Sequence, residues 1–326
     1  MSVPPLLYLS AADVEAAMPA VDERLALARK TMTALVHDAE LPPKVGVHPP
    51  APGGFTAAMP ALLRGHDDAG LLGMKWVVVF PTNDRLGVRA IHATVVINDA
   101  DTGLPLAILD GAPITAQRTA AVSGVALAEW APPDTRRVAM IGAGVEGHSH
   151  LEVVARLCAG TELVIASRHA ERAGALAERA RATGRFDTVS STTDPRSAVE
   201  GADVVITMVA FGPNRQTLPA ESLRSARLVV GVDYDMCVPA DFAHGASRFL
   251  TDDVDQLLGA RHDEVFAGYP DPDASIGQAL LGEAPAARGD GPILVSHLGV
   301  GLADVVFAAA IVDRARADGI GLHLPR

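Results

Sequence analysis

A glycine-rich turn between an apolar strand pattern and a helical pattern constrains this chain more than any other feature. The apolar run 138–141 ends in Gly142-Ala143-Gly144-Val145-Glu146-Gly147, and apolar residues at helical spacing follow. In such a unit the first glycine makes a tight turn, the second lets the backbone approach a pyrophosphate, and the third lets helix pack on strand. The helix N-terminus offers N–H groups and a positive dipole end. The turn predicts a dinucleotide site, with a plain glycine turn of another α/β fold as the alternative.

The end of the next strand pattern bears on the choice of cofactor. An apolar run at 162–166 is followed by Ser167 and Arg168, with no acid nearby. An acid about 20 residues after the glycines would bind the ribose 2′-hydroxyl of NAD. A guanidinium instead matches the geometry of a 2′-phosphate. We therefore predict NADP, with NAD as the alternative; the simpler interpretation is that Arg168 is a solvated residue.

The two parts of the chain show different patterns. After a hinge at 131–134, strand patterns (188–191, 203–208, 227–232, 249–252) alternate with helical ones (169–181, 195–199). This alternation predicts a parallel, doubly wound Rossmann sheet. The earlier part has helical patterns (11–18, 22–41), then strand patterns (44–48, 55–62, 70–80, 88–98, 104–109) and a helix to 130 that we expect Thr115 to cap. A last helix is expected at 302–317.

Composition argues against several classes of function. The net charge is −12 and the sequence holds no basic block, so nucleic acid is not an expected partner. Two cysteines, Cys158 and Cys237, make neither a disulfide framework nor a metal spacing, and the histidines suggest no metal site. No signal peptide or run of about 20 apolar residues is visible. We expect a cytoplasmic protein without a membrane span or a metal.

Short motifs spread from near residue 40 to near residue 305 carry a family resemblance. They are Met59-Pro60, Gly73-Met-Lys75-Trp-Val, Thr102-Gly-Leu-Pro-Leu-Ala-Ile-Leu-Asp-Gly111, Ile114-Thr-Ala-Gln-Arg118-Thr-Ala-Ala-Val-Ser123, Gly142-Ala-Gly144 with His150-Leu151, Gly201-Ala-Asp-Val-Val-Ile-Thr207, Gly231-Val-Asp233, and Ser296-His-Leu-Gly299 with Asp304. In this order they resemble the ornithine cyclodeaminase/mu-crystallin family over nearly the whole chain.

The resemblance implies an architecture and a reaction class. It implies an α+β substrate-binding and dimerisation domain at 1–130, completed by 301–326, and a Rossmann domain at 131–300. It also implies a homodimer joined through the substrate domains. Members of the family work at the Cα–N bond of an amino or imino acid with a nicotinamide cofactor, so a small-molecule substrate of this class is expected.

An amino or imino acid needs cations for its carboxylate, and three residues of the first part suit this role. Lys44, Lys75 and Arg118 fall on predicted strands or a helix whose side chains can converge. Arg118 can bind a carboxylate through two parallel hydrogen bonds, whereas Lys75 gives a compact charge. Lys75 stands in an otherwise apolar run, so it must reach solvent or meet an anion. The alternatives are an outward Lys75, a surface ion pair for Arg118 and a solvated Lys44.

Two further residues are site candidates. Asp233 follows an apolar strand whose carboxyl end should line the cofactor crevice. Its carboxylate can exchange the proton of the substrate nitrogen, or it can merely cap the strand. His92, on a strand pattern, either contacts substrate or packs in the core. The predicted cofactor contacts are Gly142, Ala143, Gly144, Val145, Glu146, Gly147, Ser167, Arg168, Thr119, Thr207, Met208 and Val209.

Two departures from the family pattern matter for function. Ornithine cyclodeaminases continue from this Asp into a Pro-Gly-Lys-type segment, but here Cys237 stands near the place of the Lys and Asp235 adds an acid. The second departure is Glu146, where a Gln is common; its charge would repel a pyrophosphate unless it points away. We therefore predict an NAD(P)H-dependent imine or ketimine reductase, equivalently an amino acid dehydrogenase, with Lys75 and Asp233 as the catalytic residues. The alternatives are a redox-neutral ornithine or lysine cyclodeaminase and a non-catalytic, crystallin-like NADP-binding protein.

Overall fold

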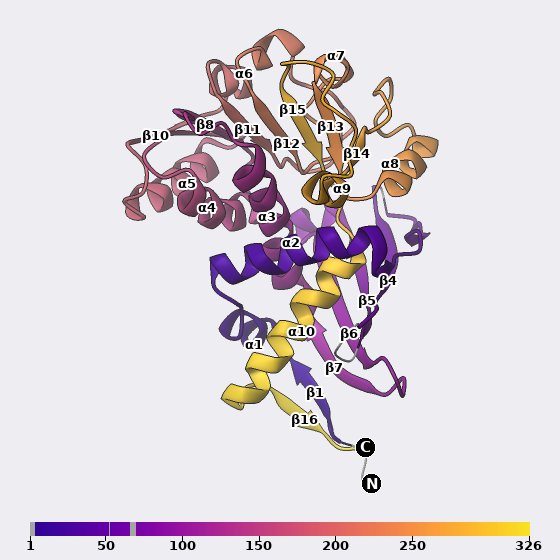
Figure 1. Cartoon of the computed structure of the whole chain (residues 1–326). Coiled ribbons are helices and arrows are strands. Elements are labelled where there is room, and N and C mark those ends of the chain that lie inside the picture. Colours follow the sequence, from indigo (N-terminus) through magenta and orange to yellow (C-terminus); the bar gives the residue numbers. More distant parts are fainter. Residues whose placement is uncertain (1–3, 52, 66–69) are drawn as a thin grey trace. The chain divides into compact units, whose positions relative to one another are not determined.

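The computed structural model describes residues 4–51, 53–65 and 70–326, and they form two compact units (Figure 1). Unit 1 comprises the chain up to Arg118 together with Gly299–Arg326, and unit 2 comprises Thr119–Leu298. The helix α3 (Gly111–Trp130) begins in unit 1 and ends in unit 2. Within the described ranges, no helix has the length and apolar character needed to cross a membrane.

Unit 2 is built on an eight-stranded sheet in which all neighbouring strands are parallel. Its order is β10-β9-β8-β11-β12-β15-β13-β14, and the direction of winding reverses between the neighbours β8 and β11. Ligands of such sheets bind outside the carboxyl ends of the strands at this reversal. The strands are β8 (Arg137–Ile141), β9 (Glu162–Ala166), β10 (Thr188–Thr192), β11 (Val204–Thr207), β12 (Leu228–Gly231), β13 (Arg248–Thr251), β14 (Ala274–Ser275) and β15 (Ile293–Ser296).

α-Helices lie in most of the crossovers between these parallel strands, and a 3₁₀ turn lies between β11 and β12. Asp194 caps α6 with a side-chain bond to the N–H of Arg196, and Ser275 with Gln278 forms a capping box on α9. These features confirm the predicted Rossmann-type fold. The helical segments of unit 2 are α4 (Val145–Leu157), α5 (Ala170–Ala182), α6 (Pro195–Val199), α7 (Ala240–Gly245), α8 (Val254–Ala260) and α9 (Ile276–Leu281), with 3₁₀ turns at Ala220–Leu223 and Arg261–Asp263.

Unit 1 is an α+β unit whose sheet has the order β16-β1-β7-β6-β5-β4-β2, with β3 also paired to β4. All pairs are antiparallel except β1 with β7. Side chains of β5 alternate, so that Gly73, Lys75 and Val77 are buried on one face. The strands are β1 (Leu6–Leu9), β2 (Ala39–Glu40), β3 (Val45–Val47), β4 (Phe55–Leu63), β5 (Leu71–Val79), β6 (Ile91–Asp99), β7 (Pro105–Asp110) and β16 (Leu322–Leu324).

Helix α10 (Gly301–Asp318) packs on β4, β5 and β6, and also contacts α2 (Val21–His37), so the two chain ends share one core (Figure 1). Gly301 makes this contact possible, because a Cβ there would come within 2.5 Å of the carbonyl oxygen of Met59. The remaining helical segments are α1 (Ala11–Ala16) and the 3₁₀ turn Pro81–Leu86.

Three expectations about the elements need correction. Thr115 does not cap α3, which begins at Gly111 after Asp110 accepts a hydrogen bond from the N–H of Ala112 (2.9 Å). Helix α2 ends at His37, because Ala39 and Glu40 pair with the edge of β4. The strands β1, β14, β15 and β16 are additional to those predicted, and each is held by pairing with a strand remote in the sequence.

Candidate active site

Three charged side chains are buried together in unit 1. The ammonium nitrogen of Lys75 lies 2.7 Å from Oδ2 of Asp304, and Nε of Arg118 lies 3.2 Å from Oδ1 of the same carboxylate. All three residues are at most 5% exposed. The outward orientation considered for Lys75 and the surface ion pair considered for Arg118 are therefore wrong. Two cations share one anion, so the cluster carries a net charge of +1 when Lys75 is protonated.

The elements around the cluster explain this geometry. Lys75 projects from the buried face of β5, Arg118 from α3, and Asp304 from the first turn of α10, where the helix dipole favours a negative charge. Gly299 admits the guanidinium, because a Cβ at this residue would lie 2.5 Å from a terminal nitrogen of Arg118. The hydroxyl of Thr115, which does not cap α3, lies 3.4 Å from the ammonium nitrogen of Lys75.

Burial changes the acidity of Lys75. Loss of solvation lowers its pKa to about 7, although the Asp304 carboxylate opposes this shift. The positive charges of Arg118 and Lys44 lower the pKa further. Lys44 is partly buried just before β3, so its charge acts on the cluster from the edge of the sheet. Lys75 can therefore change its charge close to neutral pH.

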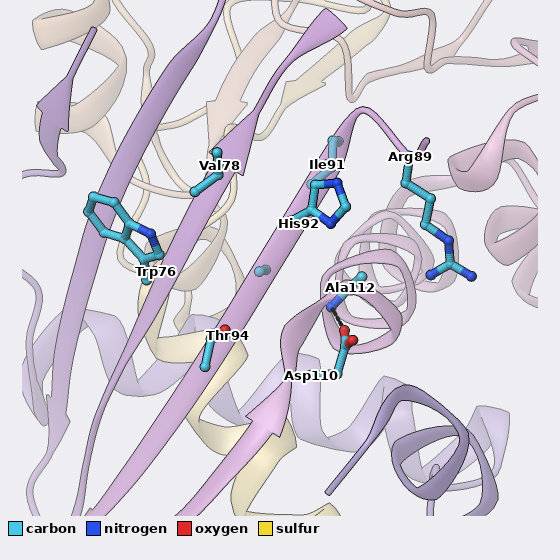
Figure 2. A pocket seen from close by; sticks show the side chains of 9 residues that line it. Trp76, Val78, Arg89, Ile91, His92, Thr94, Asp110 and Ala112 are labelled. Carbon is cyan, nitrogen blue, oxygen red and sulfur yellow. Dashed lines mark hydrogen bonds between the residues drawn. The ribbon is translucent and has the colours of Figure 1, made fainter. Parts of the chain in front are cut away.

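His92 lies apart from this cluster. It pairs with Val78 on β5, whereas Lys75 pairs with Val95, so His92 and Lys75 project from opposite faces of the sheet. His92 is exposed, so the core packing considered for it is wrong. Figure 2 shows it among the side chains that line a pocket. The pocket has a volume of about 320 Å³, and all of its lining residues belong to unit 1. The lining residues are Trp76, Val78, Arg89, Ile91, His92, Ala93, Thr94, Asp110 and Ala112.

The glycine turn of unit 2 has the shape that a pyrophosphate needs. A Cβ on Gly142 would lie 2.5 Å from the carbonyl oxygen of Met208, and one on Gly147 would lie 2.5 Å from that of Gly142. These two glycines therefore let the turn pack on β11 and let α4 begin close to the strand. A Cβ on Gly144 would meet no atom within 4 Å, so the backbone there faces open space. A dinucleotide fits this arrangement of glycines.

The other expected cofactor residues also belong to unit 2. Ala143 is buried and Val145 is exposed at the start of α4. Ser167 is partly buried after β9, and Arg168 is exposed. The carboxylate of Glu146 lies 3.5 Å from the hydroxyl of Ser149 on its own helix. Thr119 is buried on α3.

Asp233 is held at the carboxyl end of β12 by several donors. Its Oδ1 accepts a hydrogen bond from the hydroxyl of Thr207 (2.9 Å), and its Oδ2 accepts one from the N–H of Val209 (3.0 Å). Burial raises the pKa of Asp233 to about 6, and hydrogen bonds from Val209, Thr207 and the thiol of Cys237 oppose that rise. Thr207 and Val209, expected at the cofactor, thus orient this carboxylate.

A chain of buried hydrogen bonds links α4, α3 and the end of β15. Nδ1 of His150 lies 2.7 Å from the carbonyl oxygen of Glu146, so Nδ1 carries the proton. Nε2 of His150 must then accept from the hydroxyl of Ser123 at 2.9 Å. The Ser123 oxygen is left to accept from Nε2 of His297, 2.8 Å away. Burial lowers the pKa of His150 to about 3, which keeps its ring neutral.

The structure thus groups some candidates and adds others. It brings Lys75 and Arg118 together, and Thr207 and Val209 around Asp233. Asp304, Cys237 and Ser123 were not identified as site residues from the sequence. The lysine inside an apolar strand indicated that a buried anion is needed, but not that Asp304 supplies it. Among the described residues, no group of His, Cys, Asp and Glu side chains has the geometry of a metal site.

Comparison with known proteins identifies the family. Residues 8–319 match the family model "Ornithine cyclodeaminase/mu-crystallin family". The nodulation efficiency protein NfeD of Rhizobium meliloti is 30% identical over 289 residues, covering 86% of both chains. A Delta(1)-pyrroline-2-carboxylate reductase of Bacillus cereus is 26% identical over 286 residues, which cover 81% of this chain and 82% of the reductase.

Solved structures show the same fold. An archaeal alanine dehydrogenase, solved as a dimer with bound NAD, superposes with a TM-score of 0.84 at 24% identity, covering 98% of this chain and 99% of the dehydrogenase. Both units therefore have counterparts in one known architecture. The chain belongs to the ornithine cyclodeaminase/mu-crystallin family.

Proposed function

We propose that this protein is an NAD(P)H-dependent reductase of imino acids. In the reverse direction the same enzyme acts as an amino acid dehydrogenase. The observation that carries the proposal is the buried cluster of Lys75, Arg118 and Asp304, two cations on one carboxylate. Two of the similar proteins described above, the pyrroline-2-carboxylate reductase and the alanine dehydrogenase, handle substrates of this kind. Bound reduced nicotinamide supplies the hydride that such a reduction adds to Cα.

The positive cluster binds the substrate carboxylate. Its charge of +1 with Lys75 protonated matches one carboxylate, and its burial strengthens the attraction because little water screens it. The guanidinium of Arg118 has five N–H donors in a fixed fork, more than its contact with Asp304 uses. Asp304 keeps the two cations in place before the substrate arrives, and Lys44 adds positive charge at the edge.

Asp233 handles the proton of the substrate nitrogen. A pKa of about 6 leaves part of this carboxyl protonated near neutral pH, as a general acid requires. In the reductive direction the Asp233 proton moves to the imine nitrogen and a hydride is added to Cα, so the C=N bond becomes a C–N single bond. The carboxylate that remains is held by Thr207 and Val209. In the reverse direction it takes the proton back.

Unit 2 holds the cofactor. Gly142, Gly144 and Gly147 would admit the pyrophosphate, and Ser167 with Arg168 would bind a 2′-phosphate. We therefore propose NADP as the preferred cofactor, with NAD as the other possibility. The remaining predicted contacts, Ala143, Val145, Glu146, Thr119 and Met208, stay part of this proposal.

A redox-neutral cyclodeaminase is the second candidate, because the family includes such enzymes and unit 2 would serve both reactions. That reaction must also direct a second amine of the substrate. In this chain Cys237 stands near the place of the Lys of the Pro-Gly-Lys-type segment. The Cys237 thiol is buried, and burial raises its pKa. This difference supports the reductase.

We also propose a homodimer formed through unit 1. Several large apolar side chains of unit 1 are exposed on or beside β3, β5 and β6, and such a patch is typical of an interaction surface. The alanine dehydrogenase of the same fold was solved as a dimer. The exposed residues are Val45, Val47, Trp76, Leu86, Val88 and Ile91.

The test is a spectrophotometric assay of the purified protein with NADPH or NADH. The panel would combine 2-oxo acids with ammonia or methylamine and include cyclic imino acids. Loss of reduced-nicotinamide absorbance, abolished by Arg118→Met, is the expected result. Ammonia release from ornithine or lysine with catalytic NAD⁺, and no reduction of any imine, would make the protein a cyclodeaminase.

A further inference from the structure

Five aromatic side chains of unit 2 form one connected row beside Asp233. Aromatic residues make up only 4% of the sequence. The ring centroids of Phe211 and Tyr234 lie 5.0 Å apart, and those of Tyr234 and Phe266 lie 6.0 Å apart. Phe266 contacts Tyr269 at 5.3 Å, and Tyr269 contacts Phe249 at 5.8 Å. Such edge-to-face and offset contacts stabilise a rigid apolar surface.

The row runs from the core to the surface. Phe249 and Phe266 are fully buried, Tyr234 is partly buried, and Phe211 is 41% exposed. Tyr234, the ring next to the exposed Phe211, directly follows Asp233 in the chain. The outer part of the row is therefore attached to the backbone beside the proposed proton donor. Phe211 is exposed and Tyr234 only partly buried, so both rings keep some surface on which an apolar substituent of a substrate can pack.

The backbone under this row is strained. Within the described ranges, non-glycine residues have positive φ at Gln216 (53°), Tyr234 (60°), Glu264 (59°) and Phe266 (60°). Such a conformation is unfavourable for a residue with a side chain and persists only where the surroundings impose it, often at ligand sites. Asp235 holds two of these four residues in place: its carbonyl oxygen accepts a hydrogen bond from the N–H of Gln216, and its carboxylate accepts one from the N–H of Phe266.

Charge pairing in the same region argues against charged substrate side chains. Asp235 is fully buried, and its two carboxylate oxygens accept hydrogen bonds from Arg215 and from the N–H of Phe266. It therefore has no exposed surface to offer a second amine. Arg215 is ion-paired with Asp235, so the pair is neutral and provides no net charge for a second carboxylate. An apolar side chain is the class that this surface suits.

We propose that the substrate is an imino acid with an apolar side chain larger than methyl, which packs against Phe211 and Tyr234. This inference rests on the proposed reductase function. A larger apolar side chain removes more methylene or ring surface from water on binding, so its binding free energy should be more favourable than that of a methyl group.

The test compares kcat/KM for imines formed from methylamine and a series of 2-oxo acids. The series is pyruvate, 4-methyl-2-oxopentanoate, phenylpyruvate, 2-oxoglutarate and 5-guanidino-2-oxopentanoate. We expect 4-methyl-2-oxopentanoate or phenylpyruvate to exceed both pyruvate and the two charged acids at least tenfold. A maximum at pyruvate or at a charged acid would overturn the inference while leaving the reductase function intact.

Absence of turnover with every acid would overturn the reductase function instead, and binding then decides the inference. In that case the affinities of 3-phenylpropanoate, propanoate and glutarate are measured by calorimetry on the protein with bound NADP⁺. Tighter binding of 3-phenylpropanoate supports the apolar surface, and equal or weaker binding refutes it.

Variants separate this surface from general effects on folding. Phe211→Ala and Tyr234→Gly should each lower the ratio of kcat/KM for phenylpyruvate over pyruvate at least tenfold. Tyr234→Phe keeps the ring and should keep the ratio. Leu281→Ala removes another exposed apolar side chain of unit 2 and serves as the matched control. An unchanged ratio in both Phe211→Ala and Tyr234→Gly would contradict the proposed contact.

Discussion

Lys75 and Asp304 belong to the two separate chain segments of unit 1, yet their side chains form an ion pair at 2.7 Å that is buried from solvent. Replacing such a pair by apolar residues is often neutral for stability, but removing one partner leaves a buried charge uncompensated. This is why we propose that the ion pair, with Arg118 as a second cation on the same carboxylate, serves substrate binding rather than stability.

Asp304→Asn should be strongly destabilising and inactive. Removing the carboxylate leaves Lys75 and Arg118 buried without their anion, and breaking a buried pair costs about 3–5 kcal/mol. The midpoint of thermal unfolding and the rate of imine reduction should both fall. Asp313→Asn, at an exposed position of the same helix, is the control and should change neither. Full stability of Asp304→Asn would contradict the ion-pair geometry.

Substrate affinity should depend on the charge of Lys75. Because its pKa is about 7, deprotonation above that pH removes one positive charge from the carboxylate site. KM should therefore rise as the pH increases from about 7 to 9. An arginine stays charged throughout this range, so Lys75→Arg should flatten the dependence, even at a lower rate. A KM that rises equally in both proteins would assign the effect to another group.

Asp233 should make the fold less stable as the pH rises from about 4 to 6. Burial raises its pKa from 3.8 to about 6, so the folded state binds more protons than the unfolded state between these values. The stabilisation is complete below about pH 4 and is lost as the pH passes 6. The free energy of unfolding in urea, compared with that of Asp233→Asn, isolates this slope. Equal slopes would show that Asp233 keeps its ordinary pKa.

Gly144→Val should weaken cofactor binding without disturbing the fold. A side chain here would project into open space, so the protein has room for it, but it would keep a pyrophosphate from the backbone. The dissociation constant of NADPH, followed by fluorescence, should increase at least tenfold. Gly174→Ala, also at an open position, is the control for adding a side chain in unit 2.

Arg168→Ala should reduce the preference for NADPH over NADH. The guanidinium is exposed after β9 and suits a 2′-phosphate, which NADH lacks. The ratio of kcat/KM for the two cofactors should fall at least tenfold, through the NADPH value. Arg196→Ala removes an exposed cation elsewhere in unit 2 as the comparison. A ratio that stays constant would make the cofactor preference independent of Arg168.

The centre of the parallel sheet was predictable because its strands, such as β8, β11 and β12, are buried on both faces and read as short apolar runs. The run 203–208, for example, corresponds to β11, and the predicted helix 195–199 has the bounds of α6. The strand β15 escaped prediction because glycines and a proline precede it, so the segment reads as a loop. Its place between β12 and β13 comes from tertiary pairing alone.

The candidate site was predictable in its residue types but not in its pairings. An apolar strand that contains Lys75 shows that an anion is needed, yet nothing local identifies Asp304. The same limit applies around Asp235, because a positive φ is typical of glycine rather than of Tyr234 or Phe266. A backbone conformation that depends on hydrogen bonds to remote residues cannot be predicted from the residue types next to it in the sequence.

The discontinuous makeup of unit 1 has a consequence for biosynthesis. Unit 2 is one continuous stretch of chain, whereas unit 1 needs α10 and β16, which the ribosome makes after unit 2. Chains fold as they emerge, so the nucleotide-binding unit can be complete while β5 still lacks the helix that covers Lys75. The ion-pair cluster can therefore form only after unit 2 has been synthesised, and a product truncated before α10 would leave the apolar, lysine-bearing face of the unit 1 sheet uncovered.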